Sequence, residues 1–243
     1  MIYLKNFNNE NDYLTYRDGS GYGKPNVSLS IDSKAVHYNY LPIDTNGFDF
    51  VNLELPSGTL WATCNVGASK LTDYGLYFQW GDTLGYSVNQ FGKEKQFTWE
   101  NYKWSIDGSD TNFSKYTTQG EKLELEDDAA HVYMEGDWHM PTSSQIQELA
   151  KYIKWEWTTL NGVNGRLLTS KINTEKSIFI PAAGYVLGDK VYDSGTGGYV
   201  WTSMLSSTTD VKNGNNLGFS SSRVGFGDYS QRKGGFSIRG VIG

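Results

Sequence analysis

The stretch that decides the fold is Trp61-Ala62-Thr63-Cys64-Asn65-Val66-Gly67-Ala68. Four further segments follow it in order along the chain: Tyr77-Phe78-Gln79-Trp80-Gly81, Asp128-Ala129-Ala130 leading to Gly136-Asp137-Trp138-His139-Met140-Pro141-Thr142, Ile178-Phe179-Ile180-Pro181-Ala182-Ala183-Gly184-Tyr185, and Gly235-Phe236-Ser237-Ile238-Arg239. Small or apolar residues flank the tryptophans in and near these segments. We therefore predict that four of them are buried in one core: Trp61, Trp80, Trp138 and Trp201.

The composition favours strands joined by many tight turns. The 243 residues include 28 Gly, 17 Tyr, 11 Phe and 8 Trp against only 5 Pro. Glycine supplies the positive φ angles that tight turns need, and aromatic side chains fit pleated surfaces. With 38% hydrophobic and 20% charged residues, the chain is globular, not disordered.

Two helices stand out from this strand-rich background. Residues 125–134 start with acidic side chains, which favour a helix N-terminus. The second helix starts at Thr142, which precedes Gln145 by three and so forms a capping box. Helical spacing gives this second helix a buried face, predicted to consist of Ile146, Leu149, Ala150 and Ile153.

Strands are predicted on both sides of these helices, at 48–53, 59–65, 76–80, 177–180, 184–187, 198–203, 217–221 and 235–241. Residues 82–120 form a long insertion whose aromatic side chains we expect to fold back onto the body. The prediction is an α+β fold, a mixed and mostly antiparallel sheet with two helices and long loops.

The first 45 residues read as a separate module ahead of a domain at 46–243. Alternating apolar residues at 27–31 and 36–40, with a turn at 32–34, predict a β-hairpin. Around it we expect helical turns at 8–17, a loop at 19–25 and a linker at 41–47. A lone hairpin is marginal in water, so this module is predicted to attach to a partner or to oligomerise.

The five segments together resemble the "major paralogous domain" family of gut and rumen Bacteroidetes and their phages. The resemblance covers residues 48–243 and implies a C-type-lectin-like fold, related to formylglycine-generating enzymes and to the variable receptor-binding domains of phage tail proteins. Residues 24–29 and 36–39 resemble N-terminal segments of Bacteroides phage virion proteins. His139 stands where the family usually has arginine.

The resemblance implies a phage virion structural protein, a head or tail fiber or decoration component assembled in the bacterial host cytoplasm. Its C-terminal domain would bind host glycan or another virion protein, and by analogy with phage fibers a homotrimer is favoured. Two alternatives remain open. One is a purely structural capsid or tail protein without ligand binding, and the other is an enzyme of the formylglycine-generating type.

No set of residues predicts catalysis, a cofactor or a catalytic metal. His37, His131 and His139 lack the spacing of a metal site, and the single cysteine, Cys64, is predicted to be a buried structural thiol. Formylglycine-generating enzymes need cysteine chemistry, so one thiol argues against that activity. The acidic residues near Asp127 are read as helix caps, with calcium binding left open: Asp127, Asp128, Glu135 and Asp137.

Charge and hydropathy exclude other partners. The net charge of −6 argues against a primary role in nucleic-acid binding. The chain has no apolar run of 18 residues, so we expect no membrane insertion. The first six residues lack the apolar region of a signal peptide, which predicts that the protein folds in a cytoplasm.

A candidate recognition surface lies in polar loops predicted at 191–199, 206–216 and 223–233. They are rich in Ser, Thr, Gly and Asn, as binding loops often are, although ordinary turns between strands have the same composition. The predicted ligand-binding residues combine flat rings with guanidinium forks, which suit sugars and carboxylates: Tyr192, Tyr199, Arg223, Phe226, Tyr229 and Arg232.

Overall fold

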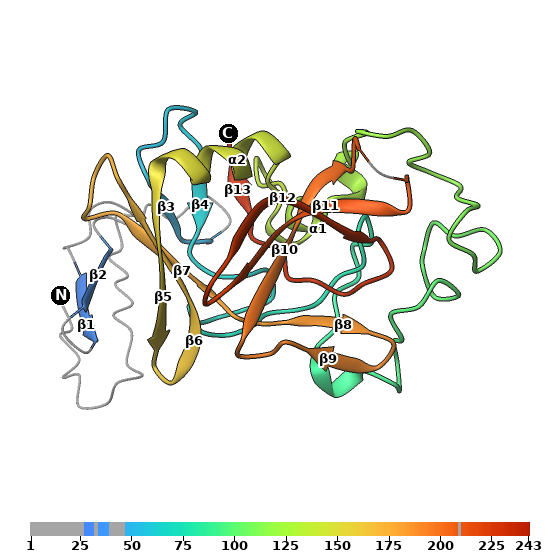
Figure 1. The fold of residues 1–243 in the computed structure, drawn as a ribbon, viewed down its shortest axis with the longest axis horizontal. Helices are drawn as coiled ribbons and strands as arrows, with labels where there is room; N and C mark the ends of the chain where they lie inside the picture. The colour runs from blue at the N-terminus through green and yellow to red at the C-terminus, as the bar shows by residue number, and fades with distance from the viewer. Residues whose placement is uncertain (1–26, 32–33, 39–46, 209) are drawn as a thin grey trace.

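The computed structural model describes residues 27–31, 34–38, 47–208 and 210–243 (Figure 1). Within these ranges the named strands pair antiparallel, in five small sheets of two or three strands. Two short α-helices and two single-turn 3-10 helices, η1 (Val88–Gln90) and η2 (Leu125–Asp127), complete the fold. This arrangement confirms the predicted α+β class and the mostly antiparallel pairing.

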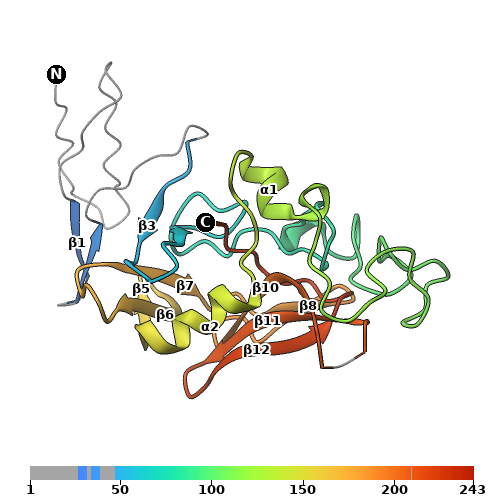
Figure 2. The ribbon, with the colours of Figure 1, turned by 90° about the horizontal axis from the view of Figure 1, so that it is seen from above.

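The predicted N-terminal hairpin is present. Its strands are β1 (Val27–Ile31) and β2 (Lys34–Tyr38), and Val27 pairs with Tyr38 at the open end. The hairpin stands at one end of the molecule, beside β7 (Ser177–Pro181) (Figures 1 and 2). The predicted helical turns at 8–17, the loop at 19–25, and the linker up to residue 46 lie outside the described residues.

We expect residues 1–45 to act as the assembly module. Two strands cannot bury an apolar side alone, so the hairpin needs a second surface, which an oligomer would provide. Light scattering should give a multiple of the monomer mass for the full chain and the monomer mass for residues 46–243. Equal monomeric masses for both would remove oligomerisation from the account.

The start and the end of the main domain form one small sheet. Its order is β13-β4-β3, with β3 (Phe50–Asn52), β4 (Leu60–Ala62) and β13 (Val241–Ile242). Backbone hydrogen bonds of 3.0 and 2.9 Å also join His139 to Val241. The domain is thus closed by its own C-terminus, which fixes the end of the chain beside its first strand.

Both predicted helices form, with corrected bounds. The acidic segment 125–134 divides into η2 and α1 (Ala129–Met134). The second helix, α2 (Ser143–Tyr152), starts at the predicted Thr142 N-cap, and the capping box with Gln145 is complete. Ile146 and Leu149 are buried as predicted, whereas Ala150 is exposed and the next predicted face residue already belongs to a strand.

That strand, β5 (Ile153–Leu160), was not predicted. It pairs with β6 (Val163–Ser170), which in turn pairs with β7. Ile153 continues the helical spacing of apolar residues only by chance. The residues after it alternate tryptophan with polar side chains, which is the pattern of a strand. Aromatic and β-branched residues favour a strand, and pairing with β6 decides the outcome.

The C-terminal third builds the remaining sheets. A hairpin of β8 (Tyr185–Leu187) and β9 (Lys190–Tyr192) lies beside a sheet of β10 (Gly197–Leu205), β11 (Asn213–Ser220) and β12 (Val224–Gln231). The predicted binding loops are therefore largely strands: β9 and β10 take up most of 191–199, and β12 takes up most of 223–233. Conversely, the predicted strands 76–80 and 235–241 make isolated bridges, apart from Val241.

All four tryptophans predicted to be core are fully buried. Trp61, Trp80, Trp138 and Trp201 have no exposed surface, which confirms that prediction. Trp61 lies in a cluster under α2 and β5–β7, whereas the other three share a second cluster with α1. In the second cluster Trp201 stacks on Phe236 with ring centroids 4.0 Å apart.

The long insertion folds back onto the body, as predicted, at the end of the molecule opposite the hairpin (Figures 1 and 2). The Tyr102 hydroxyl donates to the Trp80 carbonyl at 2.9 Å. Arg232 lies under the insertion, with its guanidinium 3.8 Å from the Phe113 ring and Nη1 3.1 Å from the Tyr116 carbonyl. A buried arginine thus fastens the insertion to the end of β12.

Candidate functional site

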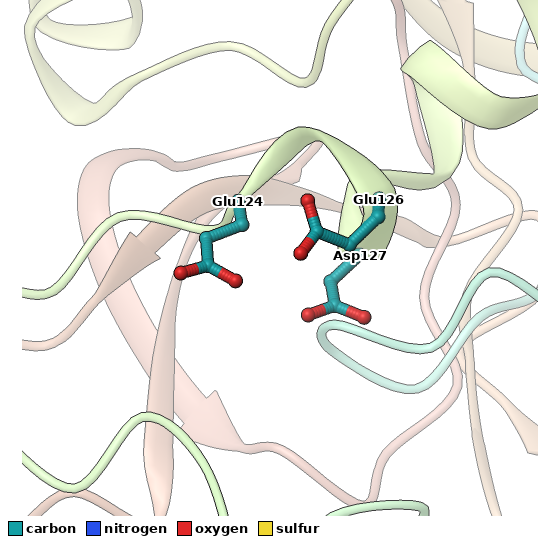
Figure 3. A group of neighbouring side chains, drawn as sticks. All are labelled: Glu124, Glu126 and Asp127. Atoms are coloured by element: carbon teal, nitrogen blue, oxygen red, sulfur yellow. The ribbon is translucent and has the colours of Figure 1, made fainter.

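The acidic residues before α1 form a paired network. Within the described residues one group has the spacing of metal ligands, the carboxylates of Glu124, Glu126 and Asp127 (Figure 3). Lys115 contacts all three, lying 2.6 Å from Asp127 Oδ2 and in close contact with Glu124. Lys103 approaches Asp127 Oδ1 at 2.9 Å. Two ammonium groups already pair with these three acids, so the group is an ion-pair network.

We expect Asp127 to stabilise the fold in a pH-dependent way. Burial opposes its charge, but hydrogen bonds from Lys115, Lys103 and Tyr116 outweigh that effect and hold the pKa of Asp127 below its ordinary value of 3.8. Asp127→Asn should lower the free energy of unfolding by about 2 kcal/mol near neutral pH. A depressed folded-state pKa gives stability above the unfolded pKa, and that stability is lost as the pH falls through the folded-state pKa.

Urea unfolding of both proteins at several pH values measures this effect. The difference in unfolding free energy should be constant at neutral pH and shrink once the pH falls below 3.8, the ordinary pKa. A difference that stays unchanged under acid conditions would show that the carboxylate charge of Asp127 does not matter.

Asp128 is a helix cap, as predicted. Its carboxylate accepts from the His131 backbone N–H at 3.1 Å and from the Met140 N–H at 2.8 Å. Burial raises the pKa of Asp128, and the backbone donors only partly offset this. Asp128 therefore joins α1 to the Trp138 segment. Glu135 and Asp137, in the same predicted cluster, are exposed and lie outside the group of potential ligands.

The two histidines in the main domain bind backbone carbonyls. His131 Nδ1 lies 3.1 Å from the Trp138 carbonyl. His139 Nδ1 lies 2.8 Å from the Met140 carbonyl and its Nε2 3.1 Å from the Gly243 carbonyl. His131 thus joins α1 to the Trp138 segment, and His139 joins that segment to the C-terminal residue. The side chain of His37 lies outside the described residues.

Cys64 is only half-buried, which corrects the predicted buried thiol. It lines a cavity of about 450 Å³ together with residues 47–49, other residues of 62–69, Tyr133 and Met134. Burial raises the pKa of the Cys64 thiol, so it is protonated at neutral pH and is a poor nucleophile. The cavity wall starts at Gly47, where the described part of the domain begins.

The six predicted ligand-binding residues do not share one surface. Tyr199 and Arg223 lie on one face of the β10–β12 sheet, and Tyr192 of the β8–β9 hairpin lies beside that face. Phe226 lies on the other face, where its ring packs 5.3 Å from that of Trp155. Tyr229 also lies on that other face, because it follows Asp228 in β12 and neighbouring side chains alternate. Its side chain is 53% exposed.

Arg232 was predicted to bind ligand, but the structure does not place it at the surface. Its side chain is fully buried beneath the insertion and cannot meet a ligand at the surface. The sequence placed it in a polar loop because glycine and charged residues surround it. The structure instead encloses its guanidinium between Phe113, Tyr102 and Trp80, where ring faces attract the cation.

Three tyrosines from different strands meet on the exposed face. Tyr185 of β8 and Tyr192 of β9 are cross-strand partners, and their rings stack at 5.4 Å with an interplanar angle of 21°. Tyr199 of β10 meets the Tyr185 ring edge-on at 5.0 Å. The Tyr199 hydroxyl donates to Asp193 Oδ2 at 2.8 Å, and the Tyr192 side chain is 42% exposed.

An ion pair completes this face. Arg223 donates from Nη1 and Nη2 to the two carboxylate oxygens of Asp228, at 2.6 and 2.5 Å. Gly218 pairs with Tyr199 on one side and with Gly225 on the other, so the ion pair lies beside the tyrosines. We call this surface the tyrosine face; it consists of Tyr185, Tyr192, Asp193, Tyr199, Arg223 and Asp228.

Three members of the tyrosine face were missed from the sequence. Tyr185 lies in a predicted strand, and Asp193 and Asp228 lie in the predicted binding loops, but none of the three is among the predicted ligand-binding residues. The register could have found Tyr185, since a turn at Gly188 places it opposite Tyr192. Asp228 could not be placed because the β-bulge in β12 shifts its side chain onto this face.

Comparisons of the chain with protein-family models, with curated proteins and with solved structures found no match. Across the described part of the chain, no helix is long and apolar enough to cross a bilayer. The features that indicate a function are the geometry of the tyrosine face and the sequence segments quoted above.

Proposed function

We propose that the protein is a binding component of a phage particle, without enzymatic activity, whose main domain recognises carbohydrate through the tyrosine face. The N-terminal residues would attach it to other virion proteins or form the oligomer. The observation that carries the binding role is the convergence of three tyrosine rings and a fixed Arg223–Asp228 pair on an exposed sheet face.

Sugars suit such a surface because their rings have an apolar C–H face and a polar rim. An exposed ring such as Tyr192 can stack on the C–H face, while carboxylates accept hydrogen bonds from the hydroxyls. A catalytic role is less well supported. Burial and the Asp193 carboxylate raise the pKa of Tyr199, so this hydroxyl keeps its proton, and the Arg223 and Asp228 charges are engaged with each other.

The virion assignment is supported by the five segments in their order along the chain and by residues 24–29 and 36–39, which resemble N-terminal segments of phage virion proteins. A purely structural virion protein shares those features. Only ligand binding separates the two proposals, so the tyrosine face is the place to test.

Tyr192→Ala should weaken binding to the recognised glycan at least tenfold, which corresponds to about 1.4 kcal/mol. The reason is the loss of an exposed stacking ring, while the buried core is untouched. Tyr229→Ala is the matched control, since it removes an exposed tyrosine of the same domain from the opposite face. A glycan array followed by titration of the bound glycans measures both variants against the unchanged protein.

Equal losses in the two variants would contradict the assignment of the site to the tyrosine face. An array on which the unchanged protein binds no glycan would remove the carbohydrate role and leave the structural protein as the account of function.

A further inference from the structure

The charged donor of the tyrosine face and one of its hydroxyls are already bonded to carboxylates. Both terminal nitrogens of Arg223 donate to Asp228, and the Tyr199 hydroxyl donates to Asp193. A ligand carboxylate would need a free guanidinium fork, because a bidentate pair uses two parallel N–H groups. The sequence suggests sugars and carboxylates as ligands, but of its two arginines Arg232 is buried and Arg223 is paired with Asp228.

What the face offers instead is acceptors. The Asp193 and Asp228 carboxylates each have two oxygens with about four lone-pair sites, of which the hydrogen bonds from Tyr199 and Arg223 use few. One guanidinium against two carboxylates leaves a net charge of −1 on the face. An anionic ligand would therefore meet net repulsion, and it would compete with Asp228 for the Arg223 guanidinium.

The position of Asp228 is fixed by the sheet beneath it. A Cβ on Gly218 would lie 2.7 Å from Asp228 Oδ2, and a Cβ on Gly225 would overlap the same carboxylate. These two cross-strand glycines leave room for the carboxylate to lie flat on the sheet. Arg223 bonds the Asp228 carboxylate on its other side. The remaining lone pairs of Asp228 therefore keep one orientation toward solvent.

We propose that the tyrosine face takes a neutral, hydroxyl-rich sugar and rejects sugars that carry a carboxylate. This inference rests on the proposed carbohydrate-binding function and adds the chemical class of the ligand. The sugar ring stacks on Tyr192, which Tyr185 supports from behind. Its hydroxyls donate to the oxygens of Asp193 and Asp228. These oxygens accept hydrogen bonds from neutral hydroxyl groups, so the ligand needs no charge.

Matched pairs of glycans test the proposal with the full chain. Each pair ends in a neutral hexose or in the uronic acid of the same hexose, so the two differ only by the carboxylate. We expect the neutral member to bind at least tenfold more tightly. Its affinity should stay within about twofold between low and high salt, because no ligand charge is available for screening.

A variant sharpens the test. Asp228→Asn removes one negative charge and weakens the hold on Arg223, so the preference for the neutral member should fall at least fivefold. Asp137→Asn is the matched control, because Asp137 is an exposed carboxylate outside the tyrosine face and should leave the preference unchanged.

The outcomes separate the two proposals. Equal or tighter binding of the uronate by the unchanged protein overturns the neutral-sugar inference and leaves the carbohydrate-binding function standing. If Asp228→Asn fails to fold, the neutral-to-uronate ratio and the salt series of the unchanged protein still decide the question. Binding of no glycan at all ends both proposals.

Discussion

Trp138→Ala is expected to lower the free energy of unfolding by about 3–5 kcal/mol, the usual cost of removing a large buried aromatic side chain. Trp138 is fully buried, and the rings of Phe48 and Phe50 meet it edge-on at 6.3 and 6.2 Å. A Cβ on Gly240 would lie 3.1 Å from its ring, so the C-terminal segment packs directly against it. The substitution would leave a cavity where three segments meet.

Denaturant unfolding measures this loss, and Trp157→Ala serves as its control. Trp157 is partly exposed on β5, so the same chemical change there should cost less than half as much. A Trp138→Ala variant as stable as the Trp157→Ala variant would mean that the packing of β3, α1 and the C-terminal segment around Trp138 does not stabilise the domain.

Arg239→Met should also destabilise the domain by about 3–5 kcal/mol. The fully buried Arg239 donates to Asn65 Oδ1 at 3.1 Å and to the Ala62 and Phe179 carbonyls at 3.0 Å each. It thereby ties the end of the chain to β4 and β7. Methionine keeps most of the volume but supplies no donor, so these acceptors lose a charged partner in a place without water.

The matched comparison is Arg223→Met. That arginine is 62% exposed and bonds one carboxylate, and exposed ion pairs contribute at most about 1 kcal/mol. Chemical unfolding of both variants should therefore separate them clearly. If Arg239→Met proved neutral or stabilising, the desolvation cost of the buried guanidinium would outweigh the hydrogen bonds that it donates. The contacts of Arg239 with Asn65, Ala62 and Phe179 would then not stabilise the domain.

Local rules in the sequence were enough for several elements. The capping box at Thr142 predicts the start of α2, and alternation at 27–31 and 36–40 predicts the hairpin, whose second strand runs over Lys34–Tyr38. The four buried tryptophans followed from their small and apolar neighbours. In each case the signal lies within a few residues along the chain and does not depend on a distant partner.

Elements decided by distant pairing were missed. β5 continues the helical spacing of α2, and only its pairing with β6 shows that it is a strand. β12 contains two glycines and several polar residues, a composition typical of a loop, yet its pairing with β11 holds it extended. Arg232 was misplaced for the same reason, since its aromatic neighbours come from an insertion more than a hundred residues earlier.

Three of the six residues of the tyrosine face are predicted from the sequence. Tyr192, Tyr199 and Arg223 were chosen for their chemistry, and they do gather on one face. Which residues lie with them depends on the register of β10, β11 and β12 and on the bulge in β12. That register separates Tyr229 from Tyr199 by the full thickness of the sheet, although both are tyrosines of the same predicted loop set.

The most direct test of the central claim is NMR of the full chain with isotope-labelled tyrosine rings, titrated with the glycan that binds best on the array. The account predicts that the ring signals of Tyr185, Tyr192 and Tyr199 shift together as the glycan is added, while the Tyr229 signal stays in place. Shifts confined to Tyr229, or no shift in the three tyrosines at saturating glycan, would contradict a binding site on the tyrosine face.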